Sequence, residues 1–323
     1  MNGQNQNIVQ GNNNNNNNVR RFNNPFNLDP AKEDILIGRK LDRDAFCPFF
    51  ASNPEFGIGN NYYSILHVDP LKESIFHSIQ ALFFPNATFF QLSIIICYII
   101  IIIFIILLCF GLDESNLHKY FLPIKLSALD KLGSFYPKKI KENPWELYRL
   151  LTFHFSHSDL GDTFFNFLGL ITFCSTFEMF VKKHIFLLTF FLTGIFVNLS
   201  TITLFSEYQR FCGITNDITG IMGAFIMLFI MNWKECLLIF NPLGRIYTVY
   251  ALSVFIFLFL LLAYTGDFVN IFTYILGLIY GAFIFAALTK PIKVEKWKTI
   301  VRIISGITVL TSSAVSLVSF YLK

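Results

Sequence analysis

Charged residues are scarce in this 323-residue chain. Only 14% of its residues are Asp, Glu, Lys or Arg, whereas 54% are hydrophobic. Soluble domains carry about 25% charged residues, so this composition argues against a soluble protein. The net charge of +4 is too small to indicate a nucleic-acid partner. The apolar residues lie in long runs, and run length indicates membrane-spanning helices.

The six cysteines give no sign of a metal centre or a disulfide framework. None of them forms a Cys-x-x-Cys pair, and most lie inside or beside apolar runs. We therefore expect free, buried thiols, no metal ion and no other cofactor. The cysteines are Cys47, Cys97, Cys109, Cys174, Cys212 and Cys236.

The first 30 residues offer almost no apolar surface to bury. Asn12–Asn18 is an unbroken asparagine tract, and such a segment cannot offset its chain entropy. We predict a disordered tail over residues 1–30, without the basic start and apolar core of a cleavable signal peptide. Residues 31–88 are moderately polar and predict a cytosolic pre-domain. A seven-helix membrane domain is expected over residues 89–323.

Seven apolar stretches predict an all-α polytopic membrane protein. The first contains the run IIICYIIIIIFIILL without any charge. At a rise of about 1.5 Å per residue it is long enough to cross roughly 30 Å of hydrocarbon. The predicted spans cover residues 89–112, 163–181, 185–204, 213–231, 246–264, 269–288 and 300–321.

Basic residues in the short loops predict the orientation. Lys182 and Lys183 follow the second span, Lys234 follows the fourth and Lys290 follows the sixth, all on one side. Because cytosolic loops carry an excess of Lys and Arg, this side and the N-terminus are predicted to be cytosolic. The long loop over residues 113–149 is also basic and argues for the opposite orientation. We follow the short loops because three of them agree.

Small and polar residues recur at helical spacing in the fourth and sixth spans. Thr215, Thr219 and Gly223 lie at i, i+4 and i+8, so they share one helix face. Gly277 and Gly281 form a GxxxG pair in the sixth span. Small faces let membrane helices approach closely. We therefore predict that the fourth and sixth spans are in contact.

Other polar side chains near these spans need partners, because polar groups at membrane depth are costly. Tyr274 precedes Gly277 by three residues, which places it near the same end as Thr215. For Asp217 we expect a structural partner: Asn216, Asp162 or a buried water. For His157 we expect a role in stabilising its loop, at a distance from the sixth span.

A set of polar and glycine residues stands in a fixed order along the chain. An Arg precedes the second span, a His, an Asn and a Glu follow at fixed spacing, and glycines mark the fourth and sixth spans. Over residues 125–290 this order resembles the rhomboid family of intramembrane proteases. The resemblance implies a six-helix core, to which the seventh span adds a C-terminal helix. The matching residues are Arg149, His157, Asn166, Glu178, Gly213, Gly220, Gly223, Gly277 and Gly281.

The chain departs from the family at the positions that carry its chemistry. The nucleophile position, Ser in the family, holds Thr215, and the base position, His in the family, holds Tyr274. The second His of the second span is replaced by Asp162, and the Gly after the nucleophile by Asn216. Of the side chains that would hold an oxyanion, Asn166 alone keeps the donor role.

These replacements remove groups that acyl transfer needs. A hydroxyl nucleophile needs a base within hydrogen-bonding reach, and a Tyr phenol with a reference pKa of about 10 stays protonated at neutral pH. The extra methyl of Thr215 crowds the approach. An ionised Asp162 repels a developing oxyanion, whereas a protonated Asp162 could donate a hydrogen bond to it. The resemblance therefore implies an inactive pseudoprotease that binds transmembrane segments of client proteins in the lipid bilayer.

Two other functions stay open at this point. One is an active, divergent intramembrane endopeptidase that uses Thr215 as its nucleophile. The other is a transporter or channel, which the lack of an obvious internal repeat disfavours.

Tags inserted along the chain test the predicted orientation. The N-terminus and the loops at Lys182, Lys234 and Lys290 are expected to be cytosolic, whereas the loop at Lys138 and the C-terminus are expected on the opposite side. Protease protection of the tags in sealed membranes measures this. Cytosolic access to a tag at Lys138 would contradict the seven-span arrangement.

Overall fold

The computed structural model describes residues 90–205, 210–239, 253 and 268–322. This part of the chain is helical, apart from loops and two isolated β-bridges. Six of its helical segments are long and apolar enough to cross a membrane. The protein is thus an integral, multi-pass membrane protein of the all-α class.

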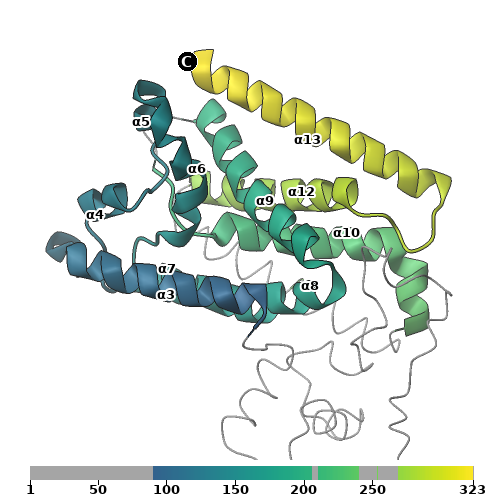
Figure 1. The fold of residues 1–323 in the computed structure, drawn as a ribbon, viewed down its shortest axis with the longest axis horizontal. Helices are drawn as coiled ribbons and strands as arrows, with labels where there is room; N and C mark the ends of the chain where they lie inside the picture. The colour runs from purple at the N-terminus through teal and green to yellow at the C-terminus, as the bar shows by residue number, and fades with distance from the viewer. Residues whose placement is uncertain (1–89, 206–209, 240–252, 254–267, 323) are drawn as a thin grey trace, which may run out of the picture.

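The spanning segments are distributed along the described chain from Leu92 to Leu322 (Figure 1). The second combines two α-helices with a π-helical turn between them. The segments are α3 (Leu92–Phe110), α7 (Leu160–Gly169) with η6 (Leu170–Cys174) and α8 (Ser175–Phe180), α9 (Lys183–Leu204), α10 (Thr215–Ile239), α12 (Phe268–Leu288) and α13 (Lys296–Leu322).

Short helices fill the long connection between α3 and α7. They gather beside the ends of α9 and α3 in Figure 1. These elements are η3 (Glu114–Asn116), α4 (Leu126–Lys131), α5 (Pro137–Glu142), η4 (Pro144–Tyr148), α6 (Arg149–Thr152) and η5 (Phe153–Phe155).

The structure confirms six of the seven predicted spans. The fifth, predicted over residues 246–264, lies outside the described residues except for residue 253, and the predicted tail and pre-domain lie outside them as well. The fourth helix continues past its predicted end at Met231 and runs to Ile239. Asn232 interrupts it with a non-helical backbone (φ −126°, ψ 26°). Its side chain donates to Leu228 O and accepts from Ile292 N, both at 3.0 Å, which joins the bend to the α12–α13 connection.

A carboxylate holds the start of α3 against the second span. Glu178 accepts hydrogen bonds from the backbone N–H groups of Leu92 (2.9 Å) and Ser93 (3.0 Å), and from the Ser93 hydroxyl. These N–H groups open α3 and have no partner within the helix, so Glu178 acts as its cap from another span. The positive end of the α3 dipole also favours the carboxylate there.

Glycines bring α10 and α12 into backbone contact, as predicted from the sequence. A Cβ atom on Gly281 would overlap the carbonyl group of Gly220, and one on Gly223 would overlap the carbonyl group of Leu278. Gly277 lies equally close to the side chain of Thr219. No side chain fits between the two helices along this line.

Helix α13 lies along the outside of α9 and α12 (Figure 1). A chain of hydroxyl groups attaches it: Ser200 on α9 bonds to Tyr280 on α12 at 2.7 Å and to Ser316 on α13 at 3.1 Å. Much of the remaining α13 surface is exposed and apolar, as expected of a helix that faces lipid. The seventh span is therefore an addition to the bundle, held by interhelical hydrogen bonds.

Gly281→Leu tests the close approach of α10 and α12. The branched side chain has no room against Gly220, and overpacking of this kind costs about 1–3 kcal/mol. Thermal unfolding in detergent should shift to lower temperature, and Gly277→Leu should do the same. The matched control is Gly306→Ala on α13, where the nearest atom to a new Cβ is 3.8 Å away. Unchanged stability of both α12 variants would contradict the interface.

Candidate functional site

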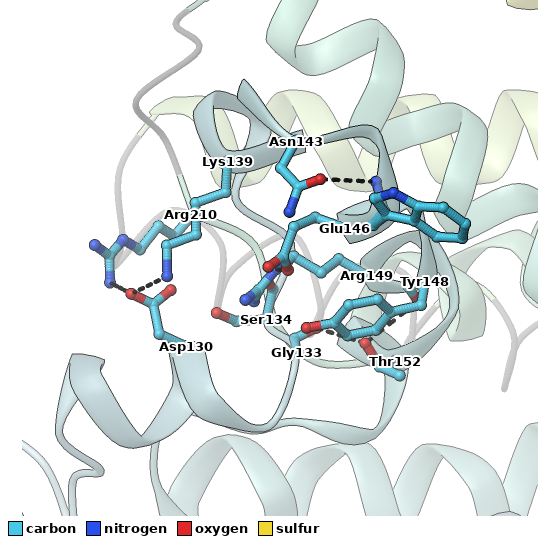
Figure 2. A network of polar contacts seen from close by, with 11 residues as sticks. Asp130, Gly133, Ser134, Lys139, Asn143, Glu146, Tyr148, Arg149, Thr152 and Arg210 are labelled. Carbon is cyan, nitrogen blue, oxygen red and sulfur yellow. Dashed lines mark hydrogen bonds and ion pairs between the residues drawn. The ribbon is translucent and has the colours of Figure 1, made fainter. Parts of the chain in front are cut away.

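A buried arginine organises the loop that precedes the second span (Figure 2). The Arg149 guanidinium donates to Ser134 O at 2.9 Å and pairs with Glu146 at 2.5 Å. This guanidinium lowers the pKa of the Glu146 carboxyl below its ordinary value. One helical turn further, the Thr152 hydroxyl donates to Gly133 O at 2.8 Å. Arg149, which the sequence indicated as a motif residue, thus fastens α6 to the segment before α5.

The loop that Arg149 fastens is hydrogen-bonded to the segment just before α10. Phe135, next to Ser134, exchanges two backbone hydrogen bonds with Phe211 (2.9 and 3.0 Å). Gly213 then donates its N–H to Phe153 O at 3.1 Å and adopts φ +91°, which favours glycine. The loop therefore sets the position of the turn that leads into Thr215.

Three side chains converge beside this turn. A Cβ on Gly213 would lie 3.3 Å from Asp162 Oδ2 and 3.7 Å from both Asn166 Nδ2 and His157 Cδ2. All three come from the start of the second span or the loop just before it. The sequence predicted that Asn166 and Asp162 share a site, and the structure places His157 with them.

The Thr215 hydroxyl bonds to this group and faces α12. It donates to Asn166 Oδ1 at 2.9 Å, and Asn166 Nδ2 in turn donates to Asp162 Oδ1 at 2.8 Å. Tyr274 of α12 lies within hydrogen-bonding reach of Thr215. Thr215, Asp162 and Tyr274 are all part-buried, so the cluster reaches the protein surface. The predicted proximity of Thr215 and Tyr274 is confirmed.

His157 is fully buried, and neither ring nitrogen has a hydrogen-bond partner among the described residues. Burial lowers its pKa to about 4, because the apolar surroundings penalise the charged imidazolium. The ring is therefore neutral at physiological pH and offers one nitrogen as an acceptor. It lies beside Gly213, and the loop-stabilising role expected from the sequence stays a prediction.

A buried pair, His154 with Asp217, was not predicted from the sequence. His154 Nδ1 bonds to Asp217 Oδ2 at 3.0 Å, and both side chains are completely buried. They fit against α9 at Gly194, where a Cβ would overlap both side chains. The expected partners of Asp217 were Asn216, Asp162 or water; the structure corrects this, because its partner is His154. The one available signal was a lone acid and a lone His in apolar surroundings.

Asn216 is held on the side of α10 that faces α9. It donates to Asn198 Oδ1 at 3.0 Å. The Asn216 side chain is thus bonded within the bundle.

Residues 144–291 match the family model described as the Rhomboid domain. Over this stretch the chain is rhomboid-like. The stretch includes Arg149, the Gly213 turn, the His154–Asp217 pair and the α10–α12 contact. None of the curated proteins compared matches the chain.

The site in this rhomboid-like domain is built from hydroxyl, amide, carboxyl and neutral imidazole groups. Within the described ranges, no three His, Cys, Asp or Glu side chains are grouped to hold a metal ion. The groups that are present can exchange hydrogen bonds.

Breaking the His154–Asp217 pair should destabilise the domain strongly. Asp217→Leu leaves a buried imidazole without its partner, and removing one member of a buried pair costs about 3–5 kcal/mol. The double variant His154→Leu with Asp217→Leu should lose less than the sum of the single variants, because both polar groups are then absent. Thermal unfolding in detergent provides the comparison.

Glu142→Gln is the matched control for that series, because its partner Lys138 lies 3.9 Å away on the surface. Exposed pairs contribute about 0–1 kcal/mol. Additive losses in the double variant would show that the pair is not coupled.

Proposed function

We propose that this rhomboid-like domain is a pseudoprotease that binds transmembrane segments of client proteins without cutting them. The observation that carries the proposal is the direction of the Thr215 hydrogen bond. The hydroxyl at the nucleophile position donates to Asn166 Oδ1 at 2.9 Å, and an amide oxygen cannot accept the proton of a nucleophile at neutral pH.

The oxyanion side of the site supports the same proposal. An oxyanion hole needs free N–H donors aimed at the reacting carbonyl oxygen. Here the Asn166 amide N–H is used by Asp162 at 2.8 Å. A carboxylate at this place repels negative charge and occupies one of the two N–H groups of the Asn166 amide.

The binding half of the proposal rests on where the polar cluster lies. Rhomboid domains act on substrates embedded in the bilayer, and here the cluster stands at the ends of three membrane helices and is part-buried. A client segment in the bilayer can contact it without entering a closed cavity.

An active protease that uses Thr215 is the rival function. The contact between Thr215 and Tyr274 favours it, since the two hydroxyls occupy the nucleophile and base positions. Tyr274 fills the base position with a group that stays protonated at neutral pH. A positioned base contributes roughly 10²–10⁴-fold to such reactions, and Tyr274 does not supply this contribution.

Purified protein in lipid vesicles should not cleave model transmembrane substrates above background, and a fluorophosphonate probe should not label it. Thr215→Ala should give the same result as the parent, because Thr215 performs no chemistry. The same vesicles should retain a transmembrane client peptide, measured by crosslinking.

The double variant Thr215→Ser with Tyr274→His places Ser and His at the nucleophile and base positions, and tests whether these two changes restore cleavage. Little activity is expected from it, because Asp162 still holds the Asn166 amide. Cleavage by the parent that disappears in Thr215→Ala would overturn the pseudoprotease assignment and establish the rival.

A further inference from the structure

We infer that residues 290–302, which join α12 to α13 and form the first turns of α13, bind the negatively charged headgroup of an anionic phospholipid. This segment contains five basic residues and one acid. Its net charge of +4 equals that of the whole chain, so the charges of the other residues balance one another. The basic residues are Lys290, Lys293, Lys296, Lys298 and Arg302, and the acid is Glu295.

Three of the five basic side chains form no ion pair with any residue that the structure describes. They are Lys293, Lys296 and Arg302, and both lysines are exposed. Glu295 accepts a hydrogen bond from Trp297 Nε1 at 2.5 Å, and one acid cannot neutralise five cations. The segment therefore keeps a positive charge, and such a cluster beside a membrane helix attracts anionic headgroups.

Arg302 lies on the side of α13 that faces the bundle. It follows Lys298 by four residues and precedes Ser305 by three, and both of these residues are buried. Its Nε atom is buried without a hydrogen-bond partner among the described residues, while the residue as a whole is part-buried. A guanidinium at membrane depth is costly without a partner. A phosphate group is a suitable partner, because the planar guanidinium binds it through two parallel hydrogen bonds.

The length of α13 places these groups at the depth of lipid headgroups. Its 27 residues extend over about 40 Å at a rise of about 1.5 Å per residue, which is about 10 Å more than the hydrocarbon core. The exposed aliphatic side chains of α13 begin at Ile300 (55%) and continue at Ile303 (58%) and Ile304 (56%). Trp297, which precedes them, is 43% exposed, and Trp is enriched at the membrane interface. The lysines before Trp297 therefore lie in the headgroup layer.

A lipid fits this surface better than a soluble phosphate does. The cations bind the phosphate of the headgroup and the exposed isoleucines next to them contact its acyl chains, whereas a soluble phosphate uses only the charged part. The orientation predicted from the short loops places the segment on the cytosolic side, whose leaflet carries anionic lipids.

Quenching of Trp297 by labelled lipids provides the test. The full-length variant Trp145→Phe with Trp233→Phe keeps Trp297 as its one tryptophan. It is reconstituted in phosphatidylcholine vesicles that contain either phosphatidic acid or phosphatidylcholine with brominated acyl chains. Brominated phosphatidic acid should quench Trp297 with an apparent affinity about tenfold higher, since each nearby Lys or Arg favours an anionic lipid. Equal quenching by the two lipids would overturn the inference, and the basic residues would then act as an orientation signal alone.

Removal of the unpaired cations should lower this preference. Lys293→Gln with Lys296→Gln, and separately Arg302→Gln, should each lower it about fivefold. If Arg302→Gln fails to fold, the exposed lysine pair decides. The control, Lys119→Gln with Lys138→Gln, removes two exposed lysines between α3 and α7, at the end of the bundle opposite to the start of α13 (Figure 1). It should keep the preference. An equal loss in this control would overturn the site, since the attraction would then follow the net charge of the whole protein.

Glycerol 3-phosphate distinguishes a lipid from a soluble phosphate. At a concentration equal to that of the brominated phosphatidic acid it should not relieve the quenching of Trp297, because it has no acyl chains. Relief of the quenching at that concentration would assign the basic residues to a soluble phosphate and overturn the lipid as their occupant.

Discussion

The backbone contact between α10 and α12 is the constraint on which the rest of the structure depends. Lipid supplies no hydrophobic force between helices, so membrane helices associate through close packing and hydrogen bonds. At Gly220 and Gly281 the two backbones meet without side chains between them. Once that face of α10 is fixed, its other faces are fixed too. Thr215 then points to the second span, and Asp217 to α9 and the loop helix η5.

Besides the glycine contacts, hydrogen bonds between polar side chains hold the spans together. Three of these hydrogen bonds join residues that lie far apart in the sequence. They are Glu178 with Ser93 at the start of α3, His154 with Asp217, and Ser200 with Ser316. In a low-dielectric interior such bonds are strong, and a missing partner is costly.

The sequence predicted the elements well and their long-range partners poorly. Run length and charge located six spans within a few residues, and the GxxxG pair predicted the α10–α12 contact, because both signals are local and periodic. The His154–Asp217 pair joins residues 63 positions apart, and no local pattern predicts such a meeting. The π-helical turn at Leu170–Cys174 and the bend at Asn232 also depend on packing that apolar periodicity does not encode.

The replaced residues of the site form one consistent set. Asp162 accepts one N–H of the Asn166 amide, and the amide oxygen of Asn166 faces Thr215. Thr215 consequently acts as a donor inside the site, and Tyr274 lies beside it where a base would stand. With Asp162 in place, Thr215 donates to the Asn166 oxygen and the Asn166 nitrogen donates to Asp162. Because these bonds are coupled, a change at position 215 alone leaves the bond between Asn166 and Asp162 in place.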